Sequence, residues 1–210
     1  MTDKALAALY PVEGAYRLLT IKLREARLLF NPLDPAPHAI RELAAEAGDW
    51  LFDGARELPG AQLKVVLYLP QLDPHIRAED MSAAIGHYFY YRGMKYRQQL
   101  RHLLRIGRQS LLIGLLFLVV CDLIARYVLA GEAGHLGLAR TGVSILGWVA
   151  MWKPVEIFLY EWWPLRQNAR SCDKLMSAPV EVRERKPGDV TPEYAELQAT
   201  VSVTVSDLRS

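Results

Sequence analysis

The chain has 210 residues, of which 51% are hydrophobic and 23% charged, and its formal net charge is +2. That length suits one domain, or one modest domain with a membrane element. So small an excess of Lys and Arg predicts no nucleic-acid partner, because nucleic-acid binders carry a clearly basic domain or face. The two cysteines, Cys121 and Cys172, lie far apart and predict neither a disulfide framework nor a metal site.

The first 78 residues show the alternation of elements expected of a small α/β unit. Residues Tyr16–Phe30 permit a strand, with a helix as the competing interpretation. The proline-rich segment Asn31–Pro37 predicts an ordered loop. Apolar residues at three- and four-residue spacing from Ile40 to Ala55 predict an amphipathic helix that stops at a Pro-Gly pair. Leu63–Leu69 is then expected to be a buried strand closed by a proline.

Two apolar stretches predict a helical hairpin that crosses a membrane twice. A helix beginning near Ala78, with acidic residues in its first turn, is expected to continue into the first span without a break. Leu111–Ala130 supplies the roughly 20 apolar residues needed to cross a hydrocarbon core about 30 Å thick. The second stretch runs from Thr141 to Trp163. The predicted organisation is a cytosolic α/β domain (1–78), an amphipathic juxtamembrane helix (79–109), a first transmembrane helix (110–130), a short external loop (131–140), a second transmembrane helix (141–164) and a cytosolic C-terminal segment (165–210).

Basic residues flank the hairpin on both sides, whereas the connecting loop carries only Arg140 and Glu132. The flanking residues are Arg92, Lys95, Arg97, Arg101, Arg105 and Arg108 before it, and Arg166, Arg170 and Lys174 after it. The positive-inside rule therefore predicts that both termini lie in the cytoplasm. Tyr160, Trp162 and Trp163 fit an aromatic belt where the second helix leaves the membrane.

The C-terminal segment holds two strand candidates, Pro179–Glu184 and Gln198–Val205. The second alternates Val with Ser or Thr, as a half-buried strand does. These strands are expected to complete a sheet with the N-terminal ones, and a disordered tail is the alternative. The predicted fold class is therefore an α+β membrane protein, with a two-helix transmembrane hairpin and a small cytosolic α/β domain that C-terminal strands are expected to complete.

Four charged residues fall inside the predicted spans, where each costs about 2.5 to 3.5 kcal/mol at the centre of a helix. Asp122 and Arg126 are four residues apart, and Lys153 and Glu156 are three apart, so each pair shares a helical face. Counted from the cytoplasmic ends of the spans, Asp122 lies roughly 20 Å deep and Lys153 roughly 16 Å deep, so a contact between the two helices is feasible. The quartet is interpreted as holding the hairpin or an oligomer together. A proton or ion path, or placement near the outer boundary, are the alternatives.

The helix before the first span is amphipathic. One face of it carries four arginines, Arg97, Arg101, Arg105 and Arg108. We expect this face to contact anionic lipid headgroups or a partner. In the alternative interpretation, these arginines only set the topology. An aromatic run, His87–Tyr91, lies earlier on the same helix. Aromatic residues on several helical faces are more typical of contact with a domain core and a neighbouring subunit than of a cofactor site.

No motif in the sequence predicts a catalytic, metal or cofactor site. The five histidines include no zinc-binding spacing, and neither a nucleophile elbow nor a phosphate-binding or dinucleotide-binding glycine loop occurs. The sequence therefore predicts a protein that is not an enzyme and has no cofactor.

Three segments carry a resemblance to a known family. They are Phe30–Pro37, the stretch Gly107–Leu111 that opens the first span, and Gly147–Glu156 with Tyr160–Pro164 in the second. In this combination the chain resembles, up to about Arg183, a family of uncharacterised bacterial two-span inner-membrane proteins. The resemblance implies a location in the bacterial inner membrane and implies no activity.

The leading functional hypothesis is a homo-oligomeric membrane scaffold or accessory subunit that recruits a partner through its cytosolic domain, with a membrane protein as one candidate partner. The rival is a small homo-oligomeric ion channel or transporter whose polar residues line a path. A membrane-bound enzyme ranks third.

Overall fold

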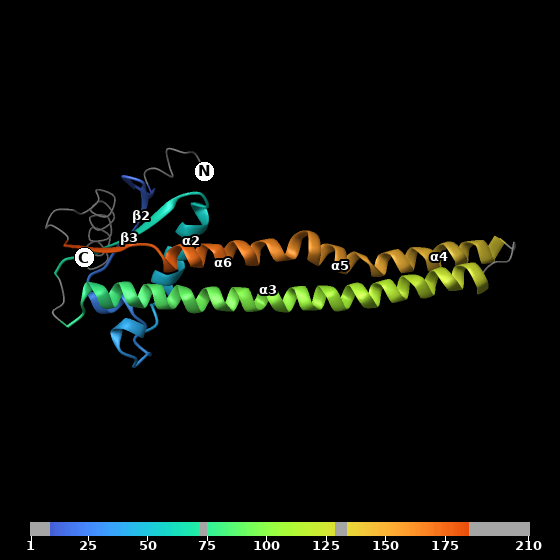
Figure 1. Ribbon diagram of the computed structural model, residues 1–210, viewed down its shortest axis with the longest axis horizontal. Helices are drawn as coiled ribbons and strands as arrows, with labels where there is room; N and C mark the ends of the chain where they lie inside the picture. The colour runs from blue at the N-terminus through green and yellow to red at the C-terminus, as the bar shows by residue number, and fades with distance from the viewer. Residues whose placement is uncertain (1–8, 72–74, 129–133, 185–210) are drawn as a thin grey trace, which may run out of the picture. The chain divides into compact units, whose positions relative to one another are not determined.

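The computed structural model describes residues 9–71, 75–128 and 134–184, which form a mixed α+β fold (Figure 1). It contains a small sheet and two long helical segments, Ala78–Tyr127 and Gly137–Met176, which are long and apolar enough to cross a membrane. The described residues divide into two compact units. One combines residues up to Tyr88 with those from Lys174, and the other comprises Phe89–Asp173.

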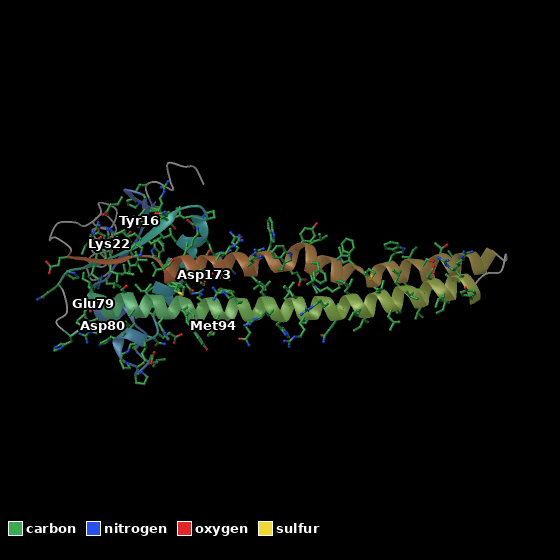
Figure 2. The ribbon with its side chains drawn as sticks, in the orientation of Figure 1. Tyr16, Lys22, Glu79, Asp80, Met94 and Asp173 are labelled. Carbon is green, nitrogen blue, oxygen red and sulfur yellow. The ribbon has the colours of Figure 1, made fainter. Side chains whose placement is uncertain are left out.

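The first unit is built on a four-stranded sheet with the order β1-β2-β3-β4. The strands are β1 (Val12–Glu13), β2 (Tyr16–Lys22), β3 (Gln62–Leu69) and β4 (Val180–Glu184). β1 is antiparallel to β2, whereas β2, β3 and β4 run parallel to one another. Figure 2 labels Tyr16 and Lys22 at the two ends of β2.

β2 settles the competition between strand and helix in favour of a strand for its seven residues. It pairs with β3 from Tyr16 opposite Gln62 to Lys22 opposite Tyr68. Parallel pairing gives its backbone groups partners along the sheet, which outweighs the local helical propensity of a segment rich in Leu and Arg. The remainder of the ambiguous segment leaves the sheet and forms a 3₁₀ turn, Ala26–Leu29.

The connection from β2 to α2 is ordered by short polar side chains. The Asn31 carboxamide oxygen accepts a hydrogen bond from the backbone N–H of Leu33, and the Asp34 carboxylate accepts bonds from the N–H groups of Ala36 and Glu42. These donors lower the pKa of Asp34. The predicted loop therefore holds a defined conformation through local side-chain to backbone bonds.

Helix α2 (Ala45–Glu57) is the predicted amphipathic helix, although it begins five residues later than the apolar pattern does. A 3₁₀ turn at His38–Ile40 occupies the start of the pattern. The helix buries Leu51 and Ala55 completely, and Gly54 lies so close to Leu19 of β2 that an added Cβ would be 2.7 Å from its Cδ2. This contact packs α2 against one face of the sheet.

Helix α3 (Ala78–Leu123) begins where the sequence predicts, with Glu79 and Asp80 in its first turn (Figure 2). Its helical path continues through a π-helical turn, η3 (Ile124–Val128). The chain returns through α4 (Gly134–Ala150), α5 (Trp152–Glu156), a second π-helical turn η4 (Ile157–Glu161) and α6 (Trp162–Met176). In Figure 1 this returning series lies alongside α3.

The chain then enters β4, which pairs in parallel with β3 from Val65 opposite Val180 to Leu69 opposite Glu184. The prediction of a strand at Pro179–Glu184 that joins the N-terminal sheet is therefore confirmed. The other candidate, Gln198–Val205, lies outside the described residues. The helical hairpin is thus an insertion between two neighbouring strands of one sheet.

Candidate functional site

The helices of the hairpin approach each other through small residues, which fixes their register. A Cβ built on Gly107 would meet Ile157 Cγ2 at 2.8 Å, and one built on Gly114 would meet the Ala150 carbonyl oxygen at 3.1 Å. On the returning chain, a Cβ on Gly147 would be 3.1 Å from Cys121 Cβ. Backbones this close exclude larger side chains, as at packed helix interfaces in membranes.

The break between α4 and α5 has a local cause in the sequence. Pro154 has no N–H group, so the Ala150 carbonyl cannot receive the usual hydrogen bond from the residue four positions later. Met151 instead donates its N–H to the Trp148 carbonyl in a tighter, 3₁₀-type bond of 3.1 Å. The Ala150 carbonyl lies against Gly114, where the absence of a side chain leaves room for it.

The first predicted intrahelical pair forms as expected. Arg126 Nε lies 2.8 Å from Asp122 Oδ2, one helical turn apart. Both side chains are exposed on the surface of the hairpin, with 51% of Asp122 and 66% of Arg126 accessible. The pair therefore contributes nothing to the contact between the two helices within one chain.

The second predicted pair gains a third member that the sequence did not indicate. Lys153 Nζ lies 3.2 Å from Glu156 Oε2 and also pairs with Glu161. In a regular α-helix, residues eight apart differ by about 80° in direction and about 12 Å in height. The π-helical turn Ile157–Glu161 rotates less per residue than an α-helix, because its hydrogen bonds span five residues, and this brings Glu161 back towards the side of Lys153.

The contact between Asp122 and Lys153 that the sequence allowed is not formed. Asp122 is paired with Arg126, and Lys153 with the two glutamates. The register explains the difference, because Gly114 beside Ala150 and Gly107 beside Ile157 place Lys153 level with Leu111. Leu111 is eleven residues from Asp122, or about 16 Å along the helix.

Of the four arginines expected on one face of α3, one forms an ion pair in the structure. Arg97 forms an ion pair with Asp173 of α6. Within the described part of the chain, no ion pair engages Arg101, Arg105 or Arg108, and all three are exposed. These three guanidinium groups remain available for phosphate or carboxylate groups outside the chain.

The three interface aromatics gather at the start of α6 and just before it. Tyr160 and Trp163 are exposed, and Trp162 donates its indole N–H to the Phe158 carbonyl at 2.8 Å. The guanidinium carbon of Arg166 lies 5.6 Å from the centre of the Trp162 ring. By the register of the hairpin, Trp163 is level with the neighbourhood of Arg101. Exposed arginines and aromatic rings therefore occupy one level of the hairpin.

The aromatic run is split between core and surface. Phe89 is fully buried, and an added Cβ on Gly48 of α2 would meet the Tyr88 hydroxyl at 2.6 Å. Tyr90 and Tyr91 are about half exposed. This division agrees with the interpretation that part of the run packs in the domain, and it leaves two tyrosines on the outer surface.

A charge network that the sequence analysis missed lies on one face of the sheet. Lys64 of β3 lies 2.6 Å from Glu181 of β4 and 3.2 Å from Glu13 of β1. Arg183 joins the same two carboxylates at 2.8 Å and 2.6 Å. The bonds from Arg183 and Lys64 lower the pKa of Glu181 to about 2 and also lower that of Glu13. Its members come from three strands far apart in the chain, so no local sequence pattern could reveal it.

No group of three or more potential metal ligands occurs among residues 9–71, 75–128 and 134–184. Cys172 is fully buried in contact range of Gly93, and burial raises the pKa of its thiol to about 11, which makes it a poor nucleophile. A comparison with protein-family models, curated proteins and solved structures gave no match. The resemblance to two-span inner-membrane proteins therefore stays a prediction, and functional inference depends on the geometry.

Proposed function

We propose that this protein is a non-enzymatic membrane scaffold or accessory subunit, anchored in a bacterial inner membrane by the hairpin. The observation that carries the proposal is the pairing of β3 with β4. These strands stand on either side of the hairpin in the sequence, yet they belong to one sheet. Both ends of the hairpin must then lie on the same side of any membrane it crosses, which supports an even number of spans with a folded unit on one side.

The distribution of charge supports placing that folded unit in the cytoplasm. Between Asp80 and Asp122 the sequence contains no acidic residue, whereas it contains six Lys or Arg residues before the apolar stretch. Such an excess beside a span favours the cytoplasmic side. The unpaired arginines Arg101, Arg105 and Arg108 would face anionic lipid headgroups there, each contributing about 1 kcal/mol near a charged surface.

The surface of the first unit supports a role in recruiting a partner protein. Its sheet and α2 form a packed core, and no group of three or more potential metal ligands occurs among the described residues. Its surface includes apolar side chains at defined positions, of which Leu33 in the ordered loop is the most exposed at 88%. The ordered loop that holds Leu33 in solvent is our candidate for the partner contact, because loops positioned by a rigid scaffold often carry binding residues.

The test is purification of the tagged protein from its native membrane in mild detergent, followed by measurement of the intact mass and identification of each stoichiometric component. A foreign subunit at a fixed ratio would support the accessory role. A variant with Leu33→Ser should lose that subunit but keep its own folding, while Ile113→Ser, at an exposed position of the hairpin, should retain it. A chain that purifies alone as a monomer would contradict the scaffold proposal.

The exposure of Asp122 and Arg126 keeps one rival function open to experiment, a channel or transporter in which these side chains line a path between copies. Reconstitution in liposomes with a gradient of ions or protons measures this directly. Flux that is abolished by Asp122→Asn or Lys153→Met would favour the rival. Absence of flux under every gradient and voltage would count against it.

A further inference from the structure

The register of the hairpin separates its two charged clusters by depth. Lys153 lies level with Leu111, which is where the apolar stretch of α3 begins. If that level marks the cytoplasmic boundary of the hydrocarbon core, Lys153, Glu156 and Glu161 lie in or near the headgroup layer. Asp122 is about 16 Å further along α3, near the middle of a core about 30 Å thick.

The pair formed by Asp122 and Arg126 is incompletely satisfied at that depth. The ion pair joins Arg126 Nε to Asp122 Oδ2. Asp122 Oδ1 and four of the five guanidinium N–H donors have no partner among the described residues. The hydroxyl groups of Thr141 and Ser144, on the returning helix at this level, are bonded to carbonyls of their own helix.

Lipid tails offer no hydrogen-bond partner, so groups exposed on the hairpin at this depth require a polar surface from another molecule. Leu115 and Val119, which lie on the same flank of α3 and are exposed, leave the pair surrounded by apolar surface. The covering surface must therefore be mostly apolar and must contain both a carboxylate and a cation at one depth.

A second copy of this chain meets that description, because the pair is self-complementary. Two copies related by a twofold axis along the membrane normal would place their α3 helices side by side with the same residues at the same depth. Each Asp122 would then lie one helical turn from the partner's Arg126, a distance that an arginine side chain spans. The resulting ring of two carboxylates and two guanidinium groups has no net charge.

We infer that the Asp122–Arg126 flank of α3 is a self-association surface through which two copies of the chain pair within the membrane. The inference rests on the proposed membrane anchorage, and it identifies a second copy of the chain as the partner in the membrane. Leu115 and Val119 form the apolar part of this surface, and the Lys153 cluster lies outside it.

Cysteine crosslinking in native membranes tests the surface. In a background with Cys121→Ala and Cys172→Ala, Leu115→Cys should form a disulfide-linked dimer on mild oxidation. Val120→Cys, which points about 140° away on the helix, is the matched control and should not. Equal crosslinking at both positions, no crosslinking at Leu115→Cys, or an adduct with a different protein would overturn the inference.

Charge variants test whether the pair itself makes the contact. Asp122→Asn with Arg126→Gln should lower the crosslinked fraction at least tenfold while the chain stays in the membrane fraction. A chain carrying Arg126→Asp and another carrying Asp122→Arg should each fail to crosslink alone and should recover it when expressed together. If the neutral variant crosslinks like the parent, the inference is wrong. The scaffold proposal would stand in that case if the foreign subunit still co-purified, so the two failures are distinguishable.

Discussion

Replacement of Gly114 by alanine probes the closest backbone approach in the hairpin. Two effects oppose each other, because alanine is more favourable than glycine inside a helix by about 1 kcal/mol, whereas overpacking costs about 1 to 3 kcal/mol. The new methyl group would lie 3.1 Å from the Ala150 carbonyl oxygen and 3.2 Å from Met151 Sδ. The carbonyl belongs to the backbone at the helix break, so it cannot turn aside as a flexible side chain would.

Gly142→Ala provides the control, because Gly142 is in α4 of the same hairpin and a Cβ there would meet nothing within 4 Å. Both substitutions gain the same helical preference, so the difference between the variants isolates the packing cost. We expect Gly114→Ala to be less stable than Gly142→Ala by about 1 to 3 kcal/mol. Unfolding in mixed micelles by titration with a denaturing detergent, followed by tryptophan fluorescence, measures the difference. Equal stability of the two variants would refute the close approach of α3 to the break.

Three further outcomes are expected. Leu51→Ala, at a fully buried position of α2, should destabilise the first unit by about 2 to 5 kcal/mol in chemical denaturation. Because Glu13 and Glu181 have lowered pKa values, their stabilising contribution is complete above the unfolded-state value near 4.5 and is lost as pH falls towards about 2. Denaturation midpoints should fall over that window, and Glu181→Gln should flatten the dependence. Cys172 should react with maleimide only upon unfolding, and rapid labelling of the native protein would disprove its burial.

The elements that the sequence predicts well are those with a strong local pattern. β3 is rich in apolar and β-branched residues and is bounded by turn signals, and α3 has an acidic first turn and no proline along its length. β2 was ambiguous because its local pattern suits two structures. Only its pairing with β3, more than 40 residues later, decides between them. The two-residue strand β1 has no pattern of its own and exists because the chain turns back at Gly14, where φ is +62°.

The candidate site also combines features that a local pattern predicts with features that depend on distant parts of the chain. The spacing of Asp122 and Arg126 and of Lys153 and Glu156 is enough to predict both pairs, since the helix fixes which residues share a face. Glu161 could not be assigned to the second cluster, because its position depends on a π-helical turn for which there is no simple sequence signal. The similar depths expected for Asp122 and Lys153 were wrong, because the relative depth follows from the contacts of Gly107 and Gly114 across the hairpin and not from counting residues along each span.

The hairpin lies in the sequence between two parallel strands, and their pairing limits the lengths of its helices in one respect only. Parallel neighbours such as β3 and β4 need a crossover that carries the chain back to the end of the sheet where it started. A single helix is the usual solution. In two antiparallel helices each residue of rise in α3 is cancelled by one in the returning series, so the pairing of β3 with β4 constrains only the difference between the two lengths and leaves their common length free. That length is then available to match an external dimension, and a hydrocarbon core is a dimension that the apolar composition of both helices fits.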